Sequence, residues 1–256
     1  MIAALRRLAA IPGWLVGIWL AQVALAAGVG AIVRTTVAAA MDGDHIEPGA
    51  RWLYALADLG LDHPAIAAAA AASIGVAAVA GLLAWTLVVG LLLARLRADT
   101  STAAVLHTWW KTLPGIGAQS AWHVLMRGVM LLAALSTASA LPPAAGWPLV
   151  WLVWSVAIVG LDVARTRVVD GARPLHPRTA AVAIIDVVRH PARFGPAVAL
   201  AAAGTIVPLL VVWLGLSQLG GAMAPLAARA VALVGVGLGL WRLAVVVART
   251  EPGDDD

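Results

Sequence analysis

The sequence has no cysteine and no asparagine, only one tyrosine and one phenylalanine, and few charged residues. The absence of cysteine excludes disulfides, thiol catalysis and cysteine-ligated metals. The absence of asparagine excludes the Asn-Pro-Ala motif of aquaporin-type channels. Charged residues make up 12% of the 256 residues, whereas soluble domains have roughly a quarter, so an ordinary water-soluble domain is excluded as well.

Apolar residues make up 62% of the chain, and the mean hydropathy is +0.94. They form long runs rich in Ala, Leu and Val without the alternation of membrane-spanning strands, so helices are predicted rather than a barrel. Each run is close to the about 20 residues that cross a bilayer. We therefore predict an all-α polytopic membrane protein with six spans, at Gly13–Val33, Ala65–Ala94, Val124–Leu141, Trp147–Val163, Phe194–Leu216 and Met223–Val247.

Positive charge gathers on one side of these spans. With the first residue placed inside, thirteen Lys and Arg fall on the inner side and only Arg34 and Arg51 on the outer side. Cytoplasmic loops carry such an excess, so we expect a bacterial inner-membrane protein with both termini in the cytoplasm and no nucleic-acid partner. The inner set is Arg6, Arg7, Arg95, Arg97, Lys111, Arg165, Arg167, Arg173, Arg178, Arg189, Arg193, Arg242 and Arg249.

The spans group into three helical hairpins with the same order of elements. A short amphipathic segment ending at Pro12, Pro114 or Pro191 precedes each hairpin, and an arginine closes it. A chance match within Ala-rich sequence is the alternative to a true internal repeat. We predict one membrane domain, residues 1–256, made of hairpin one (1–97, with an outer loop at 35–64), hairpin two (98–173), hairpin three (174–249) and a polar tail (250–256).

The amphipathic segments are predicted to be elbow helices in the cytoplasmic membrane interface. Apolar residues spaced by three and four make one stripe in each, with polar residues on the other face, which is typical of a helix lying on lipid. The proline that follows is expected to break each elbow, so that the chain turns into the span. The stripes consist of Leu106, Trp109, Trp110 and Leu113 in one elbow, and of Ile184, Ile185 and Val188 in the other.

Two sets of polar residues are candidate functional groups. Gln119, His123 and Arg127 share one helix face, and two interpretations are open: Arg127 snorkels to the inner surface, or the three line a polar cavity. Asp162 lies three residues before Arg165 at a helix end. This pair forms either a local i, i+3 ion pair or an inter-hairpin bridge from Asp162 to a basic residue of the next elbow.

Asp162-Val163-Ala164-Arg165 closes the fourth span, and Arg189-His190-Pro191 precedes the fifth. In these motifs the chain resembles uncharacterised bacterial six-span inner-membrane proteins related to the membrane domain of some glycerophosphodiester phosphodiesterases. Such proteins often have an aromatic residue where this chain has Val163. The resemblance covers roughly residues 100–216. It implies elbow helices in the inner membrane and brings no established activity.

No catalytic motif or cofactor site is found in the sequence. Ser217 follows Gly215-Leu216 as in rhomboid-like proteases, but no histidine comes after it. The acidic segment 41–47 lacks the further ligands of a calcium or zinc site, so no metal is expected. We predict a non-enzymatic permease-like subunit or scaffold that contacts the bilayer, anionic lipid headgroups, and a protein partner at its cytoplasmic loops or a second copy of itself. The alternatives are a self-contained transporter of small solutes or lipids and, third, a membrane-embedded enzyme.

Overall fold

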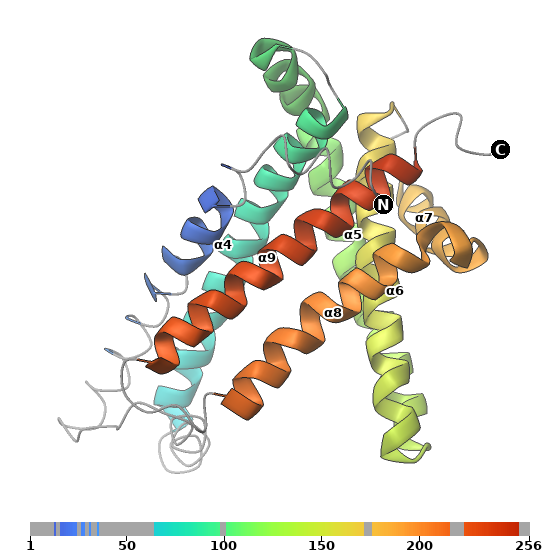
Figure 1. Ribbon diagram of the computed structural model, residues 1–256. Helices are drawn as coiled ribbons and strands as arrows, with labels where there is room; N and C mark the ends of the chain where they lie inside the picture. The colour runs from blue at the N-terminus through green and yellow to red at the C-terminus, as the bar shows by residue number, and fades with distance from the viewer. Residues whose placement is uncertain are drawn as a thin grey trace. The chain divides into compact units, whose positions relative to one another are not determined.

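The computed structural model describes residues 16–24, 64–97, 101–171, 176–215 and 223–250, together with residues 13, 27, 28, 31 and 35. Within these ranges the chain is helical and contains no strand, which confirms the predicted all-α class. The main helices, labelled in Figure 1, are α4 (Pro64–Arg97), α5 (Thr102–Ser139), α6 (Pro143–Val169), α7 (Pro177–Arg189), α8 (Pro191–Gly215) and α9 (Met223–Arg249).

Four of these helices are long and apolar enough to cross a membrane: α5, α6, α4 over the stretch Val79–Arg97, and α9 over the stretch Arg229–Arg249. They correspond to the predicted second, third, fourth and sixth spans. In α8, the stretch Pro191–Val207 is a shorter apolar helix. Most of the predicted outer loop 35–64, the first elbow and the end of the polar tail lie outside the described residues, as does part of the first span.

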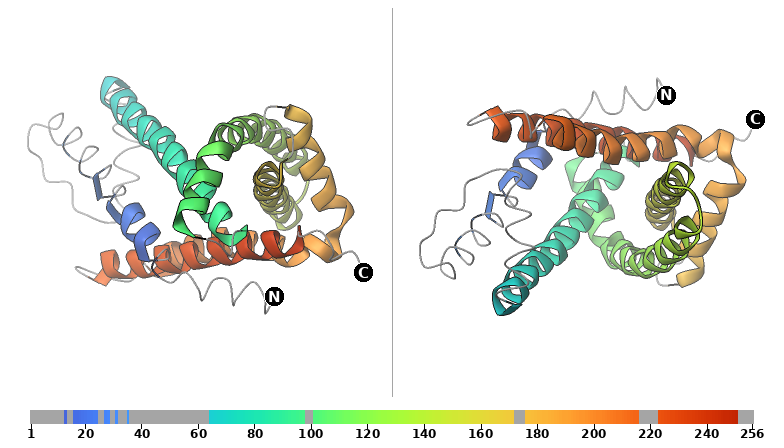
Figure 2. Two further views of the ribbon diagram at one scale, coloured as in Figure 1. Left: turned by 90° about the horizontal axis from the view of Figure 1, so that it is seen from above. Right: turned by 90° about the horizontal axis from the view of Figure 1, so that it is seen from below.

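Helix α5 does not end at Pro114, contrary to the predicted break. It runs without interruption from Thr102 to Ser139, so the elbow and the third span form one helix. A proline inside a helix removes one hydrogen bond and clashes with the carbonyl four residues earlier, and the usual result is a bend. The Thr112 hydroxyl donates to the Thr108 carbonyl at 2.9 Å, a contact that also favours bending. Figure 2 shows α5 curving past α6.

The predicted break before the fifth span is confirmed. Helix α7 ends at Arg189, and α8 begins at Pro191 after the single non-helical residue His190. The fixed φ of proline suits the first position of a helix, where its missing N–H costs nothing. The same physics starts α7 at Pro177, where the Nδ1 atom of His176 accepts a hydrogen bond from the Arg178 backbone N–H.

The chain divides into two compact units. The first, which we call the junction unit, includes Thr86–Ile206 and continues from Gly235 in α9. The second includes Gly13–Trp85 and Val207–Val234. Within the second unit, the Trp19 indole N–H donates to the Arg229 carbonyl at 2.9 Å.

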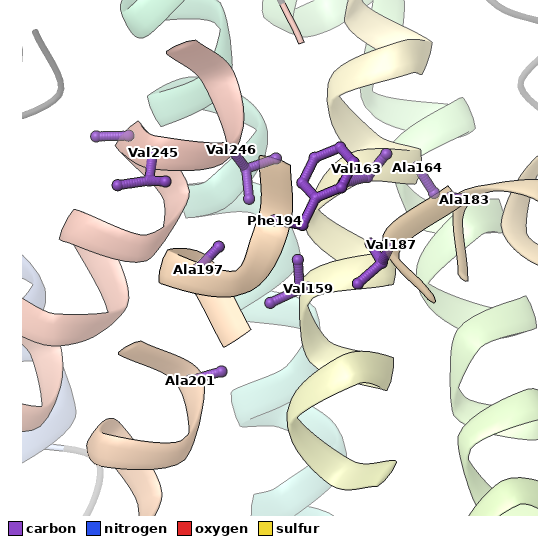
Figure 3. Close-up of a cluster of buried hydrophobic side chains, with 11 residues drawn as sticks. Val159, Val163, Ala164, Ala183, Val187, Phe194, Ala197, Ala201, Val245 and Val246 are labelled. Carbon is purple, nitrogen blue, oxygen red and sulfur yellow. The ribbon is translucent and has the colours of Figure 1, made fainter. Parts of the chain in front are cut away.

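The apolar core of the junction unit is built where α6, α7, α8 and α9 meet. The Phe194 ring of α8 lies among valine and alanine side chains (Figure 3). In Figure 2, α6 is seen nearly along its axis, with α5 curving past it and α7 beside it. The buried core residues are Val159, Val163, Ala164, Ala183, Val187, Phe194, Ala197, Ala201, Ala244, Val245 and Val246.

Small residues set how closely these helices approach. A Cβ atom added at Gly160 of α6 would lie 2.7 Å from Cγ1 of Ile184 in α7, which is too close for any side chain. A Cβ atom at Gly90 of α4 would lie 3.1 Å from the Trp109 ring of α5. Glycine at these two positions therefore lets α7 and the first part of α5 lie directly against their neighbours.

Candidate functional site

The face of α5 that carries Gln119, His123 and Arg127 points into the protein. The four-residue spacing places the three side chains on successive turns of the helix. Gln119 is fully buried, and His123 is 2% exposed. The Gln119 amide donates to the His176 carbonyl at 3.3 Å, which ties this face to the residue that caps α7.

His123 has one ring nitrogen engaged and one without a partner. Its Nδ1 atom lies 3.3 Å from the Gln119 carbonyl oxygen, within the same helix. Its Nε2 atom is buried and has no hydrogen-bond partner among the described residues. Buried polar atoms are almost always hydrogen-bonded, so this nitrogen marks a place where a partner is missing.

The Arg127 side chain contacts α6, and snorkelling and a polar cavity both stay predictions for this residue. Its guanidinium carbon lies 4.3 Å from the centroid of the Trp154 ring of α6, in a cation–π contact. The Trp154 indole N–H is buried and, in the described part of the chain, has no acceptor. Trp154 was not predicted as a site residue, because a tryptophan within an apolar run has no signal that separates it from a lipid-facing one.

Among the described residues, Arg165 is the largest fully buried side chain, and it is 1% exposed. Its Nε and Nη2 atoms donate to the Ser120 hydroxyl of α5, at 3.2 Å and 2.8 Å. The Asp162 carboxylate lies 3.9 Å from Nη1, too far for a hydrogen bond. The local i, i+3 pair is therefore a long contact, and the direct partner of Arg165 is on another helix.

The short ion pair of Asp162 joins α6 to α9. Its Oδ2 atom accepts a hydrogen bond from Nε of Arg242 at 2.7 Å, and the carboxylate is 3% exposed. The inter-hairpin interpretation expected a bridge from Asp162 to a basic residue of the next elbow, whereas the partner in the structure is Arg242, in the predicted sixth span. Nothing in the local sequence indicated Arg242 as the partner, because the rotation of one helix against another is not encoded in spacing.

The elbow helix α7 is tied to α6 by a different carboxylate. Asp186 accepts from Arg167 at 2.6 Å, and its other oxygen lies 2.8 Å from Nδ1 of His190. Since Arg167 lies in the last turn of α6 and His190 caps the end of α7, these three side chains hold α7 against α6 next to the turn into α8. These side chains are only partly buried, so solvent weakens the interaction.

Two further arginines bind the end of α9. Arg97, at the end of α4, donates to the carbonyls of Val247 and Thr250 at 3.3 Å each and pairs with Asp170 at 2.6 Å. Arg193 of α8 donates to the Arg249 carbonyl at 2.6 Å. The last carbonyls of a helix lack intrahelical partners and carry partial negative charge, which explains why cations bind there.

Some residues of the predicted elbow stripes contact neighbouring helices, and others are exposed. Trp109 donates its indole N–H to the Leu87 carbonyl of α4 at 3.0 Å, whereas the adjacent Trp110 is 71% exposed. Ile184 packs against Gly160 of α6. Exposed members of the two stripes are Leu106, Trp110, Ile185 and Val188, and Leu113 is half-buried.

Within the described ranges, no group of three or more His, Asp or Glu side chains could hold a metal ion. The Ser120 hydroxyl donates to the Ile116 carbonyl at 2.7 Å and accepts from Arg165, so its hydrogen is already committed. This arrangement can hold helices together and can present N–H donors, but it does not present an activated nucleophile.

No family model matches the sequence, and no curated protein or solved structure is detectably similar to it. The resemblance to the membrane domain of glycerophosphodiester phosphodiesterases therefore stays a prediction.

Proposed function

We propose that this chain is a six-span protein of the bacterial inner membrane that works without catalysis, as a scaffold or permease-like subunit of a membrane complex. Its spans form three hairpins with elbow helices on the cytoplasmic side, where both termini lie. Four helices long and apolar enough to cross a bilayer support this proposal, together with the inner excess of Lys and Arg.

The proposed non-catalytic role is supported mainly by the ion pairs between helices of the junction unit. Asp162 bridges α6 to α9 through Arg242, Arg97 joins the ends of α4, α6 and α9, and Asp186 joins α7 to Arg167. Ionisable groups within membrane-length helices are expensive and are expected to serve a purpose. Here that purpose is to fix helices against each other, as a scaffold requires.

The lipid bilayer is the first partner that we propose. The open side of α7 presents Val182, Ile185 and Val188 to the exterior, and Arg178 and Arg189 on the same side are also exposed. An apolar face beside arginines suits the boundary between acyl chains and anionic headgroups. A protein partner at the cytoplasmic loops, or a second copy of the chain, completes the proposed complex.

Topology can be tested with single cysteines, because the chain has none of its own. A cysteine at Asp44 should react with an impermeant maleimide from outside the cell, and one at Thr179 only after the inner side is opened. Labelling of both from the same side would reject the six-span arrangement. The scaffold role predicts that a defined protein co-purifies with the tagged chain in mild detergent at fixed stoichiometry.

A self-contained transporter is the second candidate, and the partnerless Nε2 of buried His123 favours it. Transporters place polar groups within the bilayer at the substrate site. Proteoliposomes that contain only this chain distinguish the two: solute uptake that disappears in His123→Phe supports a transporter. A chain that carries no flux but keeps its co-purified protein supports the scaffold.

A further inference from the structure

The contact between α5 and α6 is rich in hydrogen-bond donors and poor in acceptors. We call the five residues Ser120, His123, Arg127, Trp154 and Arg165 the α5–α6 seam. Arg165 binds Ser120 at one end, Arg127 stacks on Trp154 at the other, and His123 lies between them on α5. Ser120 and Arg127 are seven residues apart, which is about 10 Å along a helix.

Positive charge in and beside the seam exceeds negative charge. Arg127 and Arg165 belong to the seam and Arg242 lies beside it, and among the described residues Asp162 is the carboxylate in contact with Arg165 and Arg242. Three guanidinium groups and one carboxylate together carry two net positive charges. Asp162 also lies closer to Arg242, at 2.7 Å, than to Arg165, at 3.9 Å. Buried charge without a counter-charge is costly, so the seam favours a negatively charged ligand.

The ring nitrogens of His123 and Trp154 that lack a hydrogen-bond partner within the described residues indicate what kind of anion fits. A carbonyl oxygen only accepts hydrogen bonds, so Nδ1 of His123 carries the hydrogen in its contact with the Gln119 carbonyl. Nε2 of the neutral ring is then an acceptor, and it becomes a donor when the ring is protonated. The Trp154 N–H can only donate. A phosphate group suits this set, because it has several acceptor oxygens and one of them can carry a proton.

We propose that the α5–α6 seam binds an oxyanion of the phosphate type, held by Arg165 and Arg127 and contacted by Nε2 of His123 and the Trp154 N–H. Guanidinium groups match phosphate oxygens in geometry as well as charge. The inference does not depend on whether the chain is a scaffold or a transporter, because binding alone requires neither a partner protein nor transport.

The same phosphate chemistry has two sources. Arg165 lies four residues before the end of α6 at Val169, about 6 Å along the helix axis. That depth is close to the level of lipid headgroups, so the phosphate is either a free ion or the headgroup phosphate of a lipid in the inner leaflet. The experiment must therefore separate the two.

The test uses the full chain, purified in a non-ionic detergent and stripped of lipid. Inorganic phosphate is titrated while thermal unfolding is followed, with sodium chloride at matched ionic strength as reference. A ligand that binds the folded state raises the melting temperature as its concentration rises. His123→Phe and Arg127→Gln should each weaken the phosphate response by about tenfold, as expected for one lost charge-assisted contact.

Lys111→Gln is the matched control, because Lys111 is an exposed cation on the same helix. It should leave the phosphate response unchanged. No response to phosphate beyond that to chloride, or an equal response in all four proteins, would overturn the proposal.

Native mass spectrometry of the protein before lipid is removed distinguishes a free phosphate ion from a lipid headgroup. A bound phosphatidylglycerol that is lost in His123→Phe but kept in Lys111→Gln identifies the lipid headgroup. A phosphate response without a retained lipid identifies the free ion. Lipid retained equally in both variants places that lipid elsewhere and leaves the phosphate titration to decide. Failure of these tests leaves co-purification of a partner, and hence the scaffold proposal, unaffected.

Discussion

The contacts of α6 within the junction unit use arginine in two opposite ways. Against α9 and α7, arginine meets carboxylate at short range: Asp162 with Arg242 at 2.7 Å, and Arg167 with Asp186 at 2.6 Å. Against α5, Arg165 and Arg127 meet a hydroxyl and an aromatic ring. The first kind of contact satisfies its charges internally and has a structural role. The second leaves positive charge and a histidine nitrogen unmatched, which is why we assign ligand binding to it.

The largest effect is expected at Asp162. Changing it to asparagine keeps the shape but leaves Arg242 and the buried Arg165 without a carboxylate. Breaking a buried ion pair in this way costs about 3–5 kcal/mol. Thermal unfolding in detergent should show a fall of many degrees. An equally stable Asp162→Asn protein would mean that the bridge to α9 is not formed.

The next effect is expected where α7 packs on α6. Gly160→Ala places a methyl group against Ile184, and overpacking of this kind costs about 1–3 kcal/mol. Gly128→Ala in α5 is the matched control, because a Cβ atom there has nothing within 4 Å. That control should be neutral or stabilising by about 0.5–1 kcal/mol, since alanine favours helix more than glycine. Equal unfolding temperatures of the two variants would contradict the close contact of α6 and α7.

A smaller effect is expected at the partly exposed pair of Arg167 and Asp186. Asp186→Asn should cost no more than about 1 kcal/mol, because solvent screens such pairs. The loss should shrink further as sodium chloride is raised, whereas the loss at Asp162 should persist because buried charges are less well screened. A salt-independent loss at Asp186 would show that the pair is buried by something else, for example a partner protein or lipid.

The smallest effect is expected at Arg127. Lysine keeps the charge but loses the planar stack on Trp154, so Arg127→Lys should cost about 0.5–1 kcal/mol. Trp154→Leu should cost more by itself, and lysine at position 127 should add nothing to it. Fully additive losses in the double variant would show that the two side chains do not interact.

The sequence was sufficient for features that depend on local pattern. Apolar length located four helices that are long and apolar enough to cross a membrane, and proline after a short amphipathic stretch located the start of α8 at Pro191. The same rule failed at Pro114. A helix that contains a proline either ends there or bends, and the residues on either side determine which of the two occurs. Four-residue spacing placed Gln119, His123 and Arg127 on one face but did not show that this face turns inward.

Which side chains contact each other could not be predicted from the sequence, since these contacts depend on the rotation and depth of each helix. The sequence left open whether Asp162 pairs locally with Arg165 or with a basic residue of the next elbow, and its partner Arg242 is 80 residues away. Trp109 and Trp110 look equivalent in a stripe, but only Trp109 reaches a carbonyl of α4. The positions of Trp154 and Arg97 likewise follow from which helices become neighbours, and the sequence does not show this.

The most direct test of the account is a double-mutant cycle between Asp162 and Arg242, measured by reversible unfolding in lipid-containing micelles. Asp162→Asn, Arg242→Gln and the double variant are compared with the unmodified chain. We predict a coupling free energy of about 2–3 kcal/mol, with the double variant more stable than Asp162→Asn alone. A coupling near zero, with the two losses simply adding, would contradict the claim that paired charges fasten α6 to α9.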